Sequence, residues 1–215
     1  MFRNPIDLLV SYFNMVVLLS HSLEATVPMT EIEEWHKIFV PTMVRRIKEF
    51  HINVQATAEH IPTFYLTYEQ LILEPEQTLT DMFQFMLGVD SLEGTVLQQR
   101  IRDSVAQGSQ SKAVYTLKFK DQANNLSRHR SQYTDEEIAL MKSELRESLF
   151  FFGFVKLPDQ EHSTQFFDYD DITDEDMARF GKFRELNKAT LAACAGKAFD
   201  GKTYRCNKDV QGEWT

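Results

Sequence analysis

The chain has 215 residues, which is enough for one domain of ordinary size and an extension. Hydrophobic residues make up 43% and charged residues 26% of it, as is typical of a globular protein. The net charge of −9 argues against broad binding to nucleic acid or to an anionic membrane, so no nucleic-acid partner is expected. A local basic pocket could still bind a phosphate.

The chain has only two cysteines, Cys194 and Cys206, and no metal-ligand pattern accompanies them. We expect free thiols, because two cysteines do not make a disulfide framework in a chain of this size. No apolar run approaches the roughly 20 residues that span a membrane. The start lacks the pattern of a signal peptide, which slightly favours the cytoplasm, while a Golgi lumen location stays open if an anchor precedes Met1.

The first predicted helix covers residues 5–20, with a proline in its first turn and apolar residues on nearly every side. Thr30 and Glu33 form a capping box for a second helix, which runs to about Gln55. Pro41 should kink or split that helix, since proline lacks the N–H that the helix needs.

Residues 62–68 (Pro-Thr-Phe-Tyr-Leu-Thr-Tyr) are the clearest strand of the sequence, because they are β-branched or aromatic. A single strand needs partners, and the segment that ends at Arg3 is expected to be one of them. A short helical turn follows over 69–73. The next helix covers 75–87 and ends at Gly88.

A further helix is expected over 92–106, followed by a polar loop over 108–133. Thr134, with Glu137 in the capping-box position, begins the next helix, and Gly153 ends it. One apolar face of that helix is spaced for a core: Ile138, Met141, Leu145, Leu149 and Phe152.

Beyond Pro158 the composition changes, because residues 157–176 carry eight Asp or Glu and no Lys or Arg. Thr173 and Asp176 can cap a helix over 174–195. We interpret 157–215 as an acidic, helical extension that packs on the main domain or is partly mobile.

Arg3 and Ser11 are the first candidate binding residues. An arginine at a strand end and a serine two turns into the next helix can converge on one phosphate. The alternative is a surface arginine and an ordinary helix serine. Tyr68 is the second candidate, because a tyrosine at the carboxyl end of a strand can stack on a ligand. It could equally be an edge tyrosine.

The polar loop over 112–130 is locally basic in an acidic chain. Its basic residues are Lys112, Lys118, Lys120, Arg128, His129 and Arg130, against one acid, Asp121. It leads into a helix N-terminus near Thr134, so it could cover a polyanion. The alternative is a solvated loop.

Other chemical signals are weak. The six histidines have no metal partner at a useful spacing, so no metal site is expected. Trp35 and Phe39 lie one helical turn apart, which indicates core packing, or else an acceptor pocket. No glycine-rich phosphate loop occurs, which argues against a self-sufficient nucleotide-transfer enzyme in this chain.

Taken in order, three blocks resemble the sulfotransferase family, which uses 3′-phosphoadenosine 5′-phosphosulfate. Residues 3–12 (Arg-Asn-Pro-Ile-Asp-Leu-Leu-Val-Ser-Tyr) resemble the family's 3′-phosphate segment. Residues 65–71, followed by Glu74-Pro75 and Leu87-Gly88, resemble its Y-E-D-L…P…L-G block. Residues 125–137, running on to Phe152-Gly153-Phe154, resemble its basic loop and closing helix. The match covers about residues 1–155.

The resemblance implies an α/β, P-loop-like fold that is mostly helical with few parallel strands. Residues 1–156 would form its domain, N-terminally incomplete, and 157–215 the extension. Arg3 and Ser11 would hold the 3′-phosphate, Tyr68 would lie beside adenine, and Arg128 or Arg130 would cover the phosphates. No metal is implied. The phosphosulfate loop, its lysine and the usual catalytic histidine are expected upstream of Met1, so the catalytic residues are unknown.

Two other classes stay open. The chain could be a non-catalytic binding or scaffold protein that keeps the remnant of this fold, or a kinase of related fold, which would need a phosphate loop and Mg²⁺ ligands. For a sulfotransferase, the acceptor could be a carbohydrate, sterol, phenol or protein.

Overall fold

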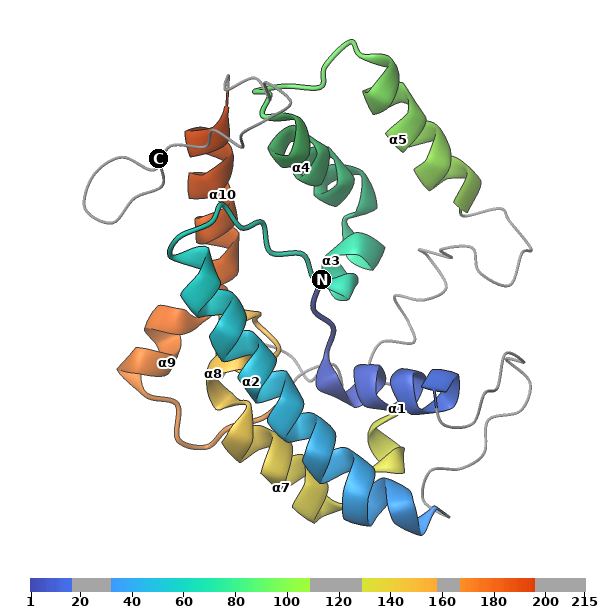
Figure 1. The fold of residues 1–215 in the computed structure, drawn as a ribbon, viewed down its shortest axis with the longest axis vertical. Coiled ribbons are helices and arrows are strands. Elements are labelled where there is room, and N and C mark those ends of the chain that lie inside the picture. Colours follow the sequence, from blue (N-terminus) through green and yellow to red (C-terminus); the bar gives the residue numbers. More distant parts are fainter. Residues whose placement is uncertain (17–31, 109–128, 158–166, 196–215) are drawn as a thin grey trace. The chain divides into compact units, whose positions relative to one another are not determined.

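The structure is a computed structural model that describes residues 1–16, 32–108, 129–157 and 167–195 (Figure 1). The chain forms two compact units. The first contains Met1–Phe2, Asn53–Asn124 and Phe183–Thr215, and the second contains Arg3–Ile52 and Asn125–Lys182. The predicted ranges 1–156 and 157–215 stay a prediction.

Helices dominate both units, as the sequence predicts. The second unit holds α1 (Pro5–Val16), the π-helical turn η2 (Trp35–Phe39), most of α2 (Val40–Ala58), the 3₁₀ turn η3 (Arg130–Gln132), α7 (Asp135–Glu144), α8 (Arg146–Phe151) and α9 (Asp174–Arg179). The first unit holds the end of α2, then α3 (Tyr68–Leu73), α4 (Pro75–Leu87), α5 (Val96–Gly108) and nearly all of α10 (Lys182–Cys194).

The prediction of a strand over 62–68 is wrong. The predicted pairing of this segment with the one that ends at Arg3 is confirmed. Within the described residues, β-structure is limited to two isolated parallel bridges, Phe2 with Thr67 and Val155 with Phe167. The Phe2 N–H donates to the Leu66 carbonyl at 2.6 Å, and the Tyr68 N–H donates to the Phe2 carbonyl at 2.7 Å. Pairing stops there because Thr67 is already the N-cap of α3, with Gln70 completing a capping box.

Aromatic packing joins α1 to η2 in the second unit. Trp35 is fully buried, stacks on Phe39 at 5.3 Å between ring centroids and meets the edge of Phe13 at 5.1 Å. Its indole N–H donates to the carbonyl of Gln132 at 3.3 Å. Trp35 is therefore a core residue.

The interruption predicted at Pro41 takes the form of a π turn. The Val40 N–H bonds to the carbonyl of Trp35, five residues back, and α2 begins at Val40. A proline in regular α-helix clashes with the carbonyl four residues earlier, and a wider turn just before it avoids that clash. The capping residue predicted for this helix, Thr30, lies outside the described residues.

The Thr134–Glu137 capping box is confirmed, and α7 packs beside α2 (Figure 1). Lys48 pairs with Glu144 at 3.0 Å between these two helices. The helix is interrupted at Leu145, so the residues predicted as one helix form two helices, α7 and α8. Its predicted apolar face is nevertheless buried throughout: Ile138, Met141, Leu145, Leu149 and Phe152. Gly153 ends α8 at a φ of 69°, in the left-handed region that favours glycine.

The capping box of Thr173 and Asp176 is also confirmed, but the single helix predicted over 174–195 is wrong. The chain turns at Gly181, where φ is 65°, and this separates α9 from α10. The expectation of free thiols is wrong for Cys194, which is buried and disulfide-bonded. Cys206 lies outside the described residues.

In the first unit, α4 packs against α3 and α5, and Phe85 of α4 packs against Cys194 of α10 (Figure 1). The α4 boundaries and the left-handed C-cap at Gly88 are as predicted. The side-chain amide of Asn187 on α10 bonds both peptide groups of Tyr65, accepting from its N–H at 2.8 Å and donating to its carbonyl at 2.6 Å. α5 begins at Val96, later than predicted.

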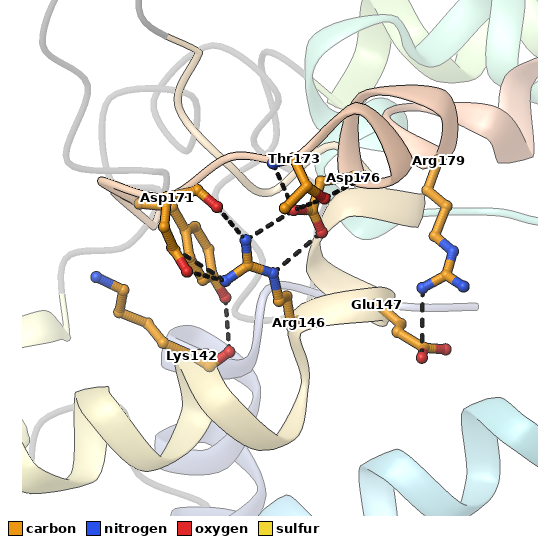
Figure 2. Close-up of polar contacts among 8 residues, drawn as sticks. Lys142, Arg146, Glu147, Asp171, Thr173, Asp176 and Arg179 are labelled. Carbon is orange, nitrogen blue, oxygen red and sulfur yellow. Dashed lines mark hydrogen bonds and ion pairs between the residues drawn. The ribbon is translucent and has the colours of Figure 1, made fainter.

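An arginine clamp fastens the acidic segment before α9 to α8 in the second unit (Figure 2). Arg146 makes a two-pronged bond to Asp176, Nε to Oδ1 at 3.0 Å and Nη2 to Oδ2 at 2.7 Å, and also bonds the Asp171 carboxylate at 3.1 Å. The guanidinium stacks over the Tyr169 ring at 4.7 Å. Hydrogen bonds from Arg146 hold the pKa of Asp176 well below its usual range.

We predict that Arg146→Ala lowers the free energy of unfolding by about 2–3 kcal/mol, because it leaves the buried Asp176 carboxylate without its arginine. Urea unfolding followed by tryptophan fluorescence measures this. Arg179→Ala is the matched control, since its partners Glu147 and Glu175 are exposed and the loss should stay below about 1 kcal/mol. Equal losses for the two variants would contradict a special role for the clamp.

Candidate functional site

The candidate site is built on the first turn of α1. The side-chain oxygen of the buried Asn4 accepts a hydrogen bond from the Ile6 N–H at 3.1 Å. The backbone carbonyl of Asn4 accepts one from the Leu8 N–H at 3.0 Å. Asn4 thus acts as the cap of α1, and Pro5 follows in the position where a missing N–H does no harm. This local chemistry ends the extended segment at Arg3 and starts a helix immediately after it.

Two side chains tie the turn η3 to the same first turn of α1. His129 Nδ1 lies 3.0 Å from Oδ1 of Asp7, whose side chain is only 1% exposed. The Tyr133 hydroxyl donates to the carbonyl of Ile6 at 2.7 Å. Because η3 spans Arg130–Gln132, these contacts hold the turn from both sides, and η3 packs against α1 (Figure 1).

Three of the predicted binding residues, Arg3, Ser11 and Arg130, belong to the second unit. Arg3 is half-buried and lies near enough to Tyr133 for its positive charge to act on that phenol. Ser11 is an exposed residue of α1. Arg130 is half-buried at the start of η3. Arg128 lies outside the described residues.

Tyr68, the remaining predicted residue, belongs to the first unit. It is half-buried and is the first residue of α3, directly after the bridge between Phe2 and Thr67. Its backbone therefore lies beside Phe2, which precedes Arg3 in the chain. The expected position at the end of an extended segment is observed, although the segment is not a regular strand.

The Tyr133 hydroxyl keeps its proton and so remains a hydrogen-bond donor. Burial raises the pKa of its phenol, and the negative charges of Asp7 and Glu137 raise it further, against the opposite effect of Arg3. The phenol therefore stays protonated at every physiological pH, and its bond to Ile6 does not depend on pH.

The contacts that assemble this site were not predicted from the sequence. Asp7 is an acidic residue in the first turn of a helix, a position that is favoured by the helix dipole alone. The sequence pattern assigns His129 to the basic residues of 112–130 and Tyr133 to the end of the polar loop predicted over 108–133. A possible signal was that Asp7 falls on the apolar helix of residues 5–20, where burial demands a partner.

A second polar constellation lies between α2 and α8. Ser148 Oγ and His51 Nδ1 are 2.5 Å apart, and both side chains are buried. They border a cavity of about 460 Å³ whose wall also includes Arg146, Glu147 and Arg179. Burial lowers the pKa of His51 to about 4, against the opposite effect of Glu147, so this imidazole is neutral at pH 7. A neutral histidine bonded to a buried serine stabilises helix packing.

Within the described residues, no group of three or more His, Cys, Asp or Glu side chains could hold a metal ion. In the same residues, no helix is both long and apolar enough to cross a bilayer.

No protein-family model, curated protein or solved structure gives a significant match to this chain. The resemblance to sulfotransferases therefore rests on the sequence blocks alone.

The free energy of unfolding should decrease as the pH falls, because His51 takes up a proton more readily in the unfolded chain. The folded-state pKa, about 4, is below the unfolded value of 6.5, so the unfolded chain binds more protons between these pH values. We predict a loss of about 3 kcal/mol from this group as pH falls from 6.5 to 4.

Urea unfolding at several pH values measures this loss. His51→Asn is the matched control, because its amide can still bond Ser148 but does not titrate. The free energy of unfolding of wild type should fall more steeply with decreasing pH than that of His51→Asn. Parallel pH profiles would contradict the assignment.

Proposed function

We propose that this chain forms the nucleotide-binding part of a sulfotransferase that uses 3′-phosphoadenosine 5′-phosphosulfate as its sulfuryl donor. The observation that carries the proposal is the packing of η3 against the first turn of α1. Two blocks of the resemblance, about 120 residues apart in sequence, meet there through Asp7–His129 and Ile6–Tyr133. Proteins that bind one ligand with both blocks need this proximity.

The chemistry of the residues fits a phosphate monoester. Arg3 and Arg130 are half-buried cations of the second unit, and partial burial strengthens their attraction for an anion. Ser11 adds a neutral hydroxyl donor on the exposed side of α1. In the proposed assignment these three residues bind the 3′-phosphate and the neighbouring phosphates, and Arg128 contributes from the same loop.

Adenine recognition is assigned to Tyr68. An aromatic ring at the end of an extended segment offers a stacking surface, and such contacts typically contribute about 1 kcal/mol. The parallel bridge at Thr67 supports this role, since it fixes the backbone at the start of α3, where Tyr68 lies.

The donor would supply an activated sulfuryl group. In the transfer, a new S–O bond forms to an acceptor hydroxyl, or an S–N bond to an amine, while the bridging S–O bond to the nucleotide breaks and a base takes the acceptor proton. The base is not assigned to any residue of this chain. The residues named here bind and orient the nucleotide, and the acceptor class (carbohydrate, sterol, phenol or protein) is left open.

The disulfide at Cys194 bears on the compartment. Disulfides persist in oxidising compartments and are rare in the cytosol. This favours the Golgi lumen over the cytoplasm as the place of the proposed reaction.

We predict that Arg3→Ala weakens binding of adenosine 3′,5′-bisphosphate by about 1.5–3 kcal/mol, the range for a hydrogen bond to a charged group. Isothermal titration calorimetry on the full chain measures the affinity. Arg45→Ala is the matched control, because Arg45 is an exposed arginine of α2 and its removal changes the net charge equally. Its affinity should stay within twofold of wild type.

Three outcomes would count against the proposal. Equal affinities for Arg3→Ala and wild type would remove Arg3 from the site. Binding of ATP that requires Mg²⁺, without binding of adenosine 3′,5′-bisphosphate, would favour the related kinase. Nucleotide binding without sulfuryl transfer to any acceptor class would support the non-catalytic alternative.

A further inference from the structure

We propose that His129 and Tyr133 are positioning residues that hold Arg130 in place for the nucleotide. This inference rests on the proposed function and adds to it, since neither residue belongs to the set of ligand contacts assigned above. Both act on the ligand only through Arg130.

Geometry supports this role. His129 directly precedes Arg130, and Tyr133 follows η3, so one anchor lies on each side of the arginine. Each anchor ends on a rigid point of α1: the carboxylate of Asp7 is 3.0 Å from His129, and the Ile6 carbonyl is 2.7 Å from the Tyr133 hydroxyl. The Tyr133 ring is further fixed against Trp35, with 5.4 Å between centroids.

The charge distribution supports it as well. The Asp7 carboxylate pairs with His129, the residue directly before Arg130. No hydrogen bond or ion pair joins the Arg130 side chain to another described residue. A half-buried cation with a fixed backbone is prepared to bind an external anion.

The test is a double-mutant cycle on the full chain, with adenosine 3′,5′-bisphosphate as the probe and titration calorimetry as the readout. We expect His129→Ala to weaken binding about tenfold, the effect of about one to one and a half kcal/mol. The same substitution should have no further effect in an Arg130→Ala background, because the anchor then has nothing to position. A role in stability alone would lower the unfolding temperature equally in both backgrounds and leave the two losses of affinity additive.

Two more variants keep the test decisive if His129→Ala folds poorly. His129→Asn places an amide nitrogen where Nδ1 lies and should restore affinity to within about threefold of wild type. Tyr133→Phe keeps the ring on Trp35 but removes the hydroxyl, and it should weaken binding about threefold.

The outcomes separate this inference from the proposed function. If wild type binds the probe and Arg3→Ala weakens it, but His129→Ala and Tyr133→Phe bind like wild type, the positioning role is overturned and the function stands. Additive losses for His129→Ala and Arg130→Ala overturn it as well. If wild type does not bind the probe at all, the proposed function fails and this inference fails with it.

Discussion

A carboxylate that is 1% exposed cannot stay charged inside a protein without a partner, and this constraint governs the second unit. Asp7 lies on the buried side of α1, so the fold must bring a donor to it. One partner is His129, 122 residues later in the chain, with Nδ1 3.0 Å from Oδ1 of Asp7. Because His129 immediately precedes η3, satisfying Asp7 also fixes the turn with Arg130, the packing of Tyr133 and the start of α7.

Local chemistry was the part of the fold that the sequence predicted well. Capping boxes at Thr134 and Thr173, the proline start of α4 and the stops at Gly88 and Gly153 all depend on residues within one turn of each other. The predictions failed where contacts between residues far apart in the sequence determine the local structure. The segment 62–68 has the composition of a strand, but it pairs at Thr67 alone, because the side chain of Asn187 and the cap of α3 take the neighbouring peptide groups.

The candidate site divides in the same way. Arg3, Ser11 and Tyr68 could be named from spacing within short segments, and their assignment to one site stays a prediction. The residues that assemble the site could not be named, since the bond between Asp7 and His129 leaves no periodic trace in the sequence. The arginine clamp at Arg146 was missed for a similar reason: the acidic run was visible, but the arginine that neutralises it lies 25 residues before Asp171.

The amide of Asn187 has a consequence for the first unit beyond holding α10 in place. An extended segment with unpaired peptide groups is a template on which another chain can add a strand, and this is a common route to aggregation. At Tyr65 one side-chain amide occupies both the N–H and the carbonyl that such a strand would need. Asn187 of α10 therefore prevents another strand from pairing at Tyr65, the protection that a neighbouring strand gives in a regular sheet.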